Sequence, residues 1–148
     1  MDLALHPAFP TFAICAALLV LKMIGVGHYV GLLRIRREAL LNPEDVEAFR
    51  SSKPGVESEH PDIARGLRAH RNDLESTLPF LAIGLAFLLV NPPVAFAKGL
   101  FVAFTVLRFL FSIFYLLGLQ PWRSLSFLAG ELCVLLMVLR MIAWGFTH

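Results

Sequence analysis

Four long apolar stretches divide the chain, with polar residues between them. They cover residues 10–33, 76–90, 99–119 and 124–146. A helix that crosses the apolar core of a bilayer needs about 20 residues, and three of the four stretches reach that length. The pattern therefore predicts an all-α integral membrane protein, built as a four-helix bundle in a single domain over residues 1–148.

The second stretch is too short by itself. Its 15 residues give a helix of about 22 Å, against a bilayer core of about 30 Å. We therefore expect this helix to begin near Arg71, which draws Asn72 and Glu75 to the membrane boundary. Helical spacing places these three residues and Arg68 on one face. The predicted spans are residues 10–33, 71–90, 99–119 and 124–146, with a polar loop over residues 34–66.

Composition supports a membrane protein. Hydrophobic residues make up 57% of the chain and charged residues 16%, which is too apolar for a typical soluble domain. The net charge is +2 without a basic stripe, so we expect no nucleic-acid partner, and we expect no metal site. Cys15 and Cys133 are interpreted as buried small side chains, with a disulfide or a catalytic thiol as the alternatives. The N-terminus lacks the pattern of a signal peptide, so we expect the first span to be retained.

Charge distribution predicts the topology. Residues 34–75 hold eight of the 13 Lys and Arg residues, whereas the turn between the second and third spans has only Lys98. The positive-inside rule places this loop in the cytoplasm and both termini on the other side. The turn at residues 118–121 then lies on the cytoplasmic side as well. Eight polar side chains thereby converge at one leaflet: Arg34, Arg68, Arg71, Asn72, Glu75, Tyr115, Arg123 and Ser124.

Several charged or titratable residues fall within the predicted spans. Arg108 and Glu131 each lie about 10–12 Å below the cytoplasmic surface, at 1.5 Å of rise per residue. Because an unpaired charge is costly there, we predict that they form an intramembrane ion pair. Lys22 and His28 are expected to face the protein interior in structural roles.

The converging residues suggest a small ligand. Arginines bind carboxylates in bidentate fashion, and Glu75 could hold an ammonium group. Glutathione, with two carboxylates, one amine and one thiol, has this chemistry. The alternative is that helix-end arginines anchor to lipid headgroups, which accounts well for Arg36, Arg37 and Arg65 but poorly for Asn72 and Glu75.

A sequence motif points the same way. Residues 68–75, Arg-Ala-His-Arg-Asn-Asp-Leu-Glu, are followed by Pro79-Phe80 and preceded by Asn-Pro-Glu-Asp at residues 42–45. This pattern resembles the MAPEG family, the membrane-associated proteins of eicosanoid and glutathione metabolism. The resemblance runs from about Phe9 to the C-terminus. It implies a homotrimer of four-helix subunits that binds glutathione as cosubstrate between neighbouring subunits.

The resemblance also implies roles for individual residues. Asp45 would assist catalysis, Arg123 would stabilise the thiolate, and Ser124 would donate a hydrogen bond to the sulfur. A plain N-cap role at the fourth span is the alternative for Ser124. The implied glutathione contacts are Arg34, Arg68, His70, Arg71, Asn72, Glu75, Tyr115 and Arg123.

Two departures bear on the reaction. Phe111 and Phe127 stand where the prostaglandin E synthase branch has a histidine and a tyrosine, whereas the Arg123-Ser124 pair resembles that branch. We therefore expect a membrane-bound glutathione transferase or peroxidase that acts on lipophilic substrates. Glutathione-dependent prostaglandin E synthesis is the alternative, followed by a non-catalytic family member and a small multidrug exporter. The expected membrane is the endoplasmic reticulum in a eukaryote or the inner membrane in a bacterium.

Overall fold

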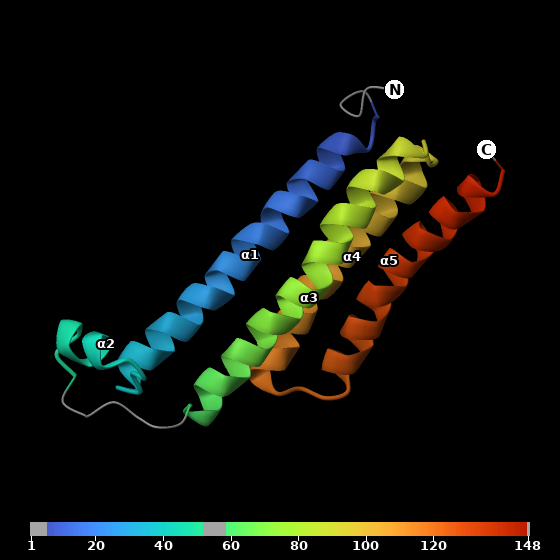
Figure 1. Ribbon diagram of the computed structural model, residues 1–148. Helices are drawn as coiled ribbons and strands as arrows, with labels where there is room; N and C mark the ends of the chain where they lie inside the picture. Colours follow the sequence, from blue (N-terminus) through green and yellow to red (C-terminus); the bar gives the residue numbers. More distant parts are fainter. Residues whose placement is uncertain (1–5, 52–58, 148) are drawn as a thin grey trace.

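The computed structural model describes residues 6–51 and 59–147, which form five helices. Four long helices run side by side, with α1 against α3 and α4 against α5, and the short α2 lies in the long loop (Figure 1). The first turn of α1 and the last turn of α5 lie at one end of the bundle, opposite α2 and the α4–α5 turn. The predicted all-α bundle is confirmed. The helices are α1 (Phe9–Arg36), α2 (Pro43–Ala48), α3 (Pro61–Leu89), α4 (Val94–Leu117) and α5 (Trp122–Gly145).

The long helices are apolar on their outer faces as well as in the core. In α1, Cys15 and Leu19 are buried, while Leu18, Leu21 and Ile24 are exposed. A helix that is hydrophobic all round suits the core of a large protein or a bilayer, and this bundle is too thin to bury both faces. All four long helices have the length and hydropathy to cross a membrane.

Helix α3 begins earlier than the apolar pattern indicates. Pro61 stands in its first turn and the His60 ring accepts a hydrogen bond from the Asp62 backbone N–H at 3.2 Å, so the helix starts ten residues before Arg71. It then runs through Pro79 to Leu89. The early start carries the polar motif of residues 68–75 into the body of a long helix.

Aromatic rings fill the core toward the end that holds the termini. Phe80 of α3 stacks on Phe104 of α4 with ring centroids 4.2 Å apart, and Phe101 meets Phe80 edge-on. Phe12 of α1 packs on both Phe80 and Phe101. Gly84 permits this packing, because a Cβ atom there would lie 2.7 Å from the Phe12 ring.

Replacing Gly84 with alanine is expected to lower the stability by about 1–3 kcal/mol, because the added methyl group overpacks a rigid aromatic cluster. Gly99→Ala is the matched control, since a Cβ there meets nothing within 4 Å. Thermal unfolding in detergent would compare the two variants. Equal melting temperatures would contradict the overpacking argument.

Candidate functional site

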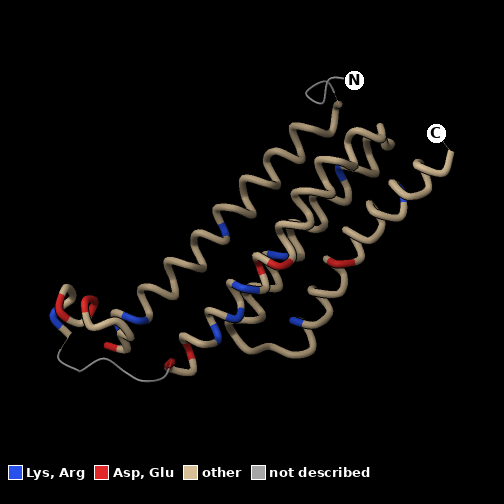
Figure 2. Tube along the Cα trace, viewed as in Figure 1, with Lys and Arg blue, Asp and Glu red and all other residues tan. Residues whose placement is uncertain are grey.

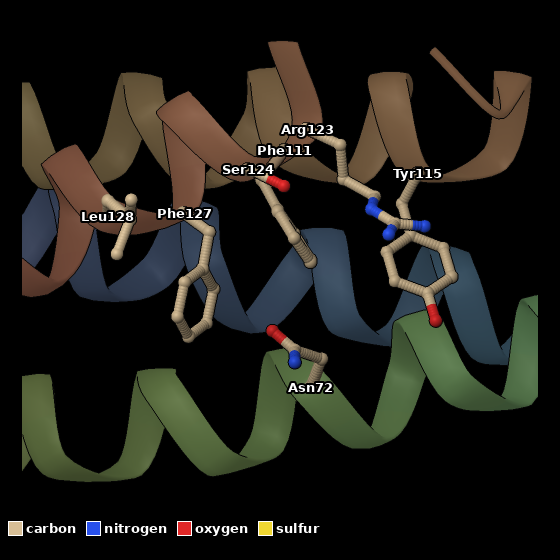
Figure 3. A pocket seen from close by; sticks show the side chains of 7 residues that line it. All are labelled: Asn72, Phe111, Tyr115, Arg123, Ser124, Phe127 and Leu128. Atoms are coloured by element: carbon tan, nitrogen blue, oxygen red, sulfur yellow. The ribbon is translucent and has the colours of Figure 1, made fainter. Parts of the chain in front are cut away.

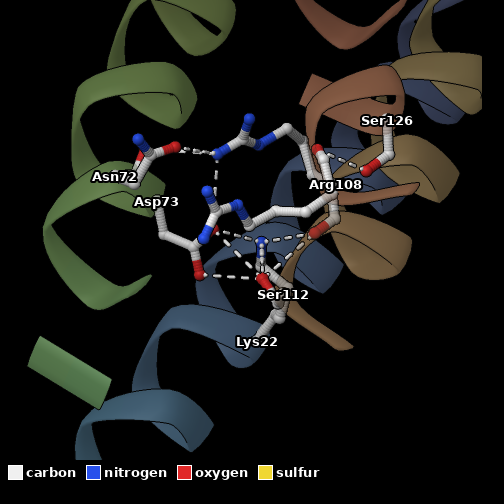
Figure 4. Close-up of polar contacts among 7 residues, drawn as sticks. Lys22, Asn72, Asp73, Arg108, Ser112 and Ser126 are labelled. Carbon is white, nitrogen blue, oxygen red and sulfur yellow. Dashed lines mark hydrogen bonds and ion pairs between the residues drawn. The ribbon is translucent and has the colours of Figure 1, made fainter. Parts of the chain in front are cut away.

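A buried ionic cluster joins α1, α3 and α4 (Figure 4). The ammonium group of Lys22 donates to Asp73 Oδ1 at 2.7 Å, to Ser112 Oγ at 3.1 Å and to the carbonyl of Arg108 at 3.1 Å. Asp73 is fully buried and Lys22 nearly so. The prediction that Lys22 faces the interior is therefore confirmed, and Asp73 is its counter-ion.

Arg108 belongs to the same cluster, and its side chain is fully buried. Its Nη2 donates to Asn72 Oδ1 at 3.0 Å and to the Asn72 carbonyl at 3.2 Å, and lies 3.5 Å from Asp73 Oδ1. The predicted direct ion pair with Glu131 is not among the salt bridges of the described residues: Arg108 pairs with Asp73, and Glu131 acts on it only as a more distant favourable charge. Because α3 starts at Pro61, Asp73 lies level with Arg108 and is its counter-ion in place of Glu131.

Two further predictions on buried residues can be judged. His28 is exposed on the outer face of α1, and its Nδ1 lies 2.8 Å from the carbonyl of Ile24, so its predicted inward orientation is wrong. Cys15 and Cys133 are both buried free thiols, as interpreted from the sequence.

A pocket of 370 Å³ opens beside this cluster, between α3 and the start of α5 (Figure 3). Polar groups line one part of it, with Arg123, Ser124 and Tyr115 near the α4–α5 turn and Asn72 across from them on α3. Phe111, Phe127 and Leu128 supply the apolar part. The structure thus brings together four of the predicted site residues from three helices.

The guanidinium of Arg123 has two neighbours in the protein. Its central carbon lies 4.9 Å from the centroid of the Tyr115 ring, within the range of a cation–π contact. On another side is the Gln120 side chain, which is also 3.0 Å from Ser124 Oγ. Helix α5 has Pro121 as its N-cap without a side-chain cap bond, so the alternative N-cap role of Ser124 is not adopted.

The buried ionic cluster lies behind the Phe111 and Phe127 rings of the pocket. The Arg108 guanidinium is 4.5 Å from the centroid of Phe111 and 5.6 Å from that of Phe127. Both rings line the pocket, so they separate the guanidinium from its interior. Asn72 is shared: it accepts from Arg108 and also lines the pocket.

Arg68, Arg71 and Glu75 of the α3 motif do not line this pocket. Arg71 Nε donates to Glu75 Oε1 at 2.9 Å, with the two side chains 81% and 57% exposed, and Arg68 is exposed too. Asn72 was predicted to share their face. It lies at the edge of that face nearest the core, and its side chain turns inward to Arg108.

The remaining predicted residues also lie elsewhere in this protomer. Arg34 Nη2 pairs with Glu59 Oε1 at 2.6 Å, and Asp45 accepts from Asn42 Nδ2 at 3.0 Å. His70 is half-buried, and its Nδ1 is buried without a hydrogen-bond partner. Arg34 stands in the last turn of α1 and Asp45 in α2. Figure 2 shows that most Lys, Arg, Asp and Glu residues gather toward that end of the bundle.

Sequence reasoning missed several residues of the site region. Asp73 and Ser112 complete the buried cluster, Leu128 lines the pocket, and Gln120 contacts both Arg123 and Ser124. One signal could have found Asp73: a lysine in the middle of a span requires a counter-ion.

Comparison with known proteins identifies relatives along nearly the whole chain. The MAPEG family matches residues 12–143. Human prostaglandin E synthase is 38% identical over 143 residues, which cover 96% of this chain and 93% of that protein. Human microsomal glutathione S-transferase 1 is 36% identical over 137 residues, covering 90% and 88%. The chain therefore belongs to the MAPEG family and is an integral multi-pass membrane protein.

Proposed function

We propose that this protein is a membrane-bound, glutathione-dependent enzyme that activates the glutathione thiol for attack on lipophilic electrophiles or hydroperoxides. The observation that carries the proposal is the pocket at the α4–α5 turn. It combines a guanidinium and a hydroxyl, from Arg123 and Ser124, with the apolar side chains Phe111, Phe127 and Leu128. A thiolate would lie at the polar side and a lipophilic substrate at the apolar side.

The chemistry requires a deprotonated thiol. An unperturbed thiol has a pKa of about 8.5 and is mostly protonated at neutral pH. The Arg123 guanidinium would stabilise the thiolate, and Ser124 would donate a hydrogen bond to it. With an aryl halide, the thiolate sulfur forms a bond to carbon and halide leaves. With a hydroperoxide, the sulfur attacks the terminal oxygen, the O–O bond breaks and the alkoxide leaves as the alcohol. The thiol of a second glutathione then attacks the resulting sulfenic acid and gives the disulfide and water.

Glutathione binding is proposed to need a second copy of the chain. Arg68, Arg71 and Glu75 are exposed on α3, and Arg34 and His70 also lie outside the pocket of their own protomer. In a homotrimer, such side chains could meet the pocket of a neighbouring subunit and hold the carboxylates and the amine of glutathione. We place this site at the cytoplasmic side, as the charge distribution predicts. Asp45 of α2 would assist catalysis from the loop.

A second candidate function is the isomerisation of prostaglandin H to prostaglandin E. The observation in its favour is the Arg123-Ser124 pair at the pocket, together with the 38% identity to human prostaglandin E synthase. In that reaction the thiolate attacks one peroxide oxygen, the O–O bond breaks and the other oxygen takes a proton to become a hydroxyl. Loss of the C–H proton beside the sulfur-bound oxygen then forms the ketone, breaks the S–O bond and regenerates the glutathione thiolate. The apolar side chains of Phe111 and Phe127 favour the general transferase or peroxidase.

An activity screen tests both functions. Purified protein in detergent would be given glutathione with an aryl halide, a lipid hydroperoxide or a prostaglandin endoperoxide. Turnover of the aryl halide or the hydroperoxide is expected. Turnover of the endoperoxide alone would establish the second function, and no turnover with any substrate would exclude both.

A further inference from the structure

We propose that Gln120 is a positioning residue: its side-chain amide would hold the Arg123 guanidinium and orient the Ser124 hydroxyl toward the glutathione sulfur. The inference rests on the proposed function, because it concerns how the same pocket prepares the thiolate. Gln120 stands in the α4–α5 turn, three residues before Arg123 and four before Ser124. It does not itself line the pocket.

The orientation of the amide follows from hydrogen-bond chemistry. With its oxygen toward Arg123, Gln120 accepts from Nη2 at 2.6 Å and from Nε at 3.1 Å. Its nitrogen then donates to Ser124 Oγ at 3.0 Å. The opposite orientation would set the amide N–H groups against the guanidinium N–H groups, donor against donor, so the first orientation is the one that satisfies all the groups.

This arrangement restricts the guanidinium on two sides. The Tyr115 ring lies 4.9 Å away, and the Gln120 oxygen occupies the edge formed by Nε and Nη2. A guanidinium has five N–H donors, and Gln120 uses two of them. Among the described residues no hydrogen-bond partner occupies the other edge, which could bind an anion, and a neutral amide leaves the full positive charge available.

The second hydrogen bond sets the direction of the Ser124 hydroxyl. Because Ser124 Oγ accepts from the Gln120 amide, its own hydrogen is free to donate elsewhere. A thiolate in the pocket is a suitable acceptor. The Gln120 amide would thus orient both the Arg123 guanidinium and the Ser124 hydroxyl toward the same sulfur.

The experiment compares Gln120→Ala with the wild type. The pKa of bound glutathione would be followed by the ultraviolet absorbance of the thiolate, together with kcat and KM for an aryl halide. We expect a higher thiol pKa and a fall in kcat of about 3- to 10-fold, the scale of one or two lost hydrogen bonds. KM for glutathione should change less than twofold, because the pocket lining remains.

The second variant, Gln120→Glu, is expected to raise the thiol pKa for a different reason. A carboxylate would keep Arg123 in place but partly neutralise its charge, so the thiol pKa should again rise, now with Arg123 still ordered. Leu119→Ala, an exposed apolar residue of the same turn, is the control and should leave the thiol pKa unchanged.

The outcomes separate this inference from the proposed function. If wild-type protein neither forms a thiolate nor turns over substrate, the proposed function fails. If wild type is active and Gln120→Ala keeps the wild-type thiol pKa, the positioning role is wrong, whatever happens to thermal stability. A lower melting temperature with an unchanged thiol pKa would show that Gln120 acts only on the fold of the turn.

Discussion

Replacing Arg123 with leucine is expected to lower kcat/KM for glutathione and an aryl halide by about 25-fold at pH 7. This is the fall in the ionised fraction when the pKa of the bound thiol rises by about two units to the unperturbed value of about 8.5, a loss of roughly 2.7 kcal/mol of thiolate stabilisation. The guanidinium lines the pocket beside Ser124 and Tyr115, so its removal takes away the one cationic side chain among the lining residues. Steady-state kinetics would measure the loss.

The pH dependence distinguishes this mechanism from a general loss of folding. If Arg123 acts by stabilising the thiolate, the activity of the leucine variant should recover as the pH rises through the higher thiol pKa. Arg140→Leu is the matched control, because Arg140 is exposed on the same helix, 17 residues further along, or about 25 Å away. A leucine variant with low activity and the wild-type pH profile would refute the thiolate role.

The four long helices and the meeting of Asn72, Tyr115 and Arg123 at one pocket could be predicted from the sequence, because both depend on the order and length of the apolar stretches. Runs of apolar residues determine where helices can cross a membrane, and alternating directions then bring Asn72, Tyr115 and Arg123 to one end. The apolar run could not show where α3 begins. Its first ten residues mix apolar side chains with four charged or titratable ones, and the start of the helix depends on Pro61 and on the cap by His60.

That error in the start of α3 also explains the wrong partner of Arg108. A helix assumed to begin at Arg71 would leave Asp73 at the surface, so Glu131 was the one carboxylate left at the depth of Arg108. In the structure Asp73 is twelve residues inside the helix and fully buried. Side-chain direction decides the rest: Asn72 and Asp73 turn to the core, whereas Arg71 and Glu75 point outward.

Arg71 and Glu75 satisfy each other on an exposed face here. An exposed ion pair of this kind contributes little to stability, at most about 0.5 kcal/mol. Breaking the Arg71–Glu75 ion pair, so that the two side chains can bind the carboxylate and the amine of a ligand, would therefore cost little free energy. This makes the pair suited to a binding role, in contrast to the buried ions of the core.

Replacing Asp73 with asparagine is expected to destabilise the protein by about 3–5 kcal/mol, the largest effect of any single substitution considered for the fold. Lys22 and Arg108 would be left as two buried cations without a carboxylate. Asparagine keeps the size of the side chain, so the loss would report charge rather than a cavity. Thermal unfolding in detergent would measure it.

Two further variants test whether charge is the cause. Glu75→Gln removes a carboxylate half a turn away on α3, but an exposed one, and should change stability by less than about 0.5 kcal/mol. Adding Lys22→Met to Asp73→Asn removes one of the two stranded cations and should recover part of the loss. If the double variant is less stable than Asp73→Asn alone, Lys22 must be held mainly by Ser112 and the Arg108 carbonyl. The carboxylate would then serve Arg108, and through it the Asn72 side chain at the pocket.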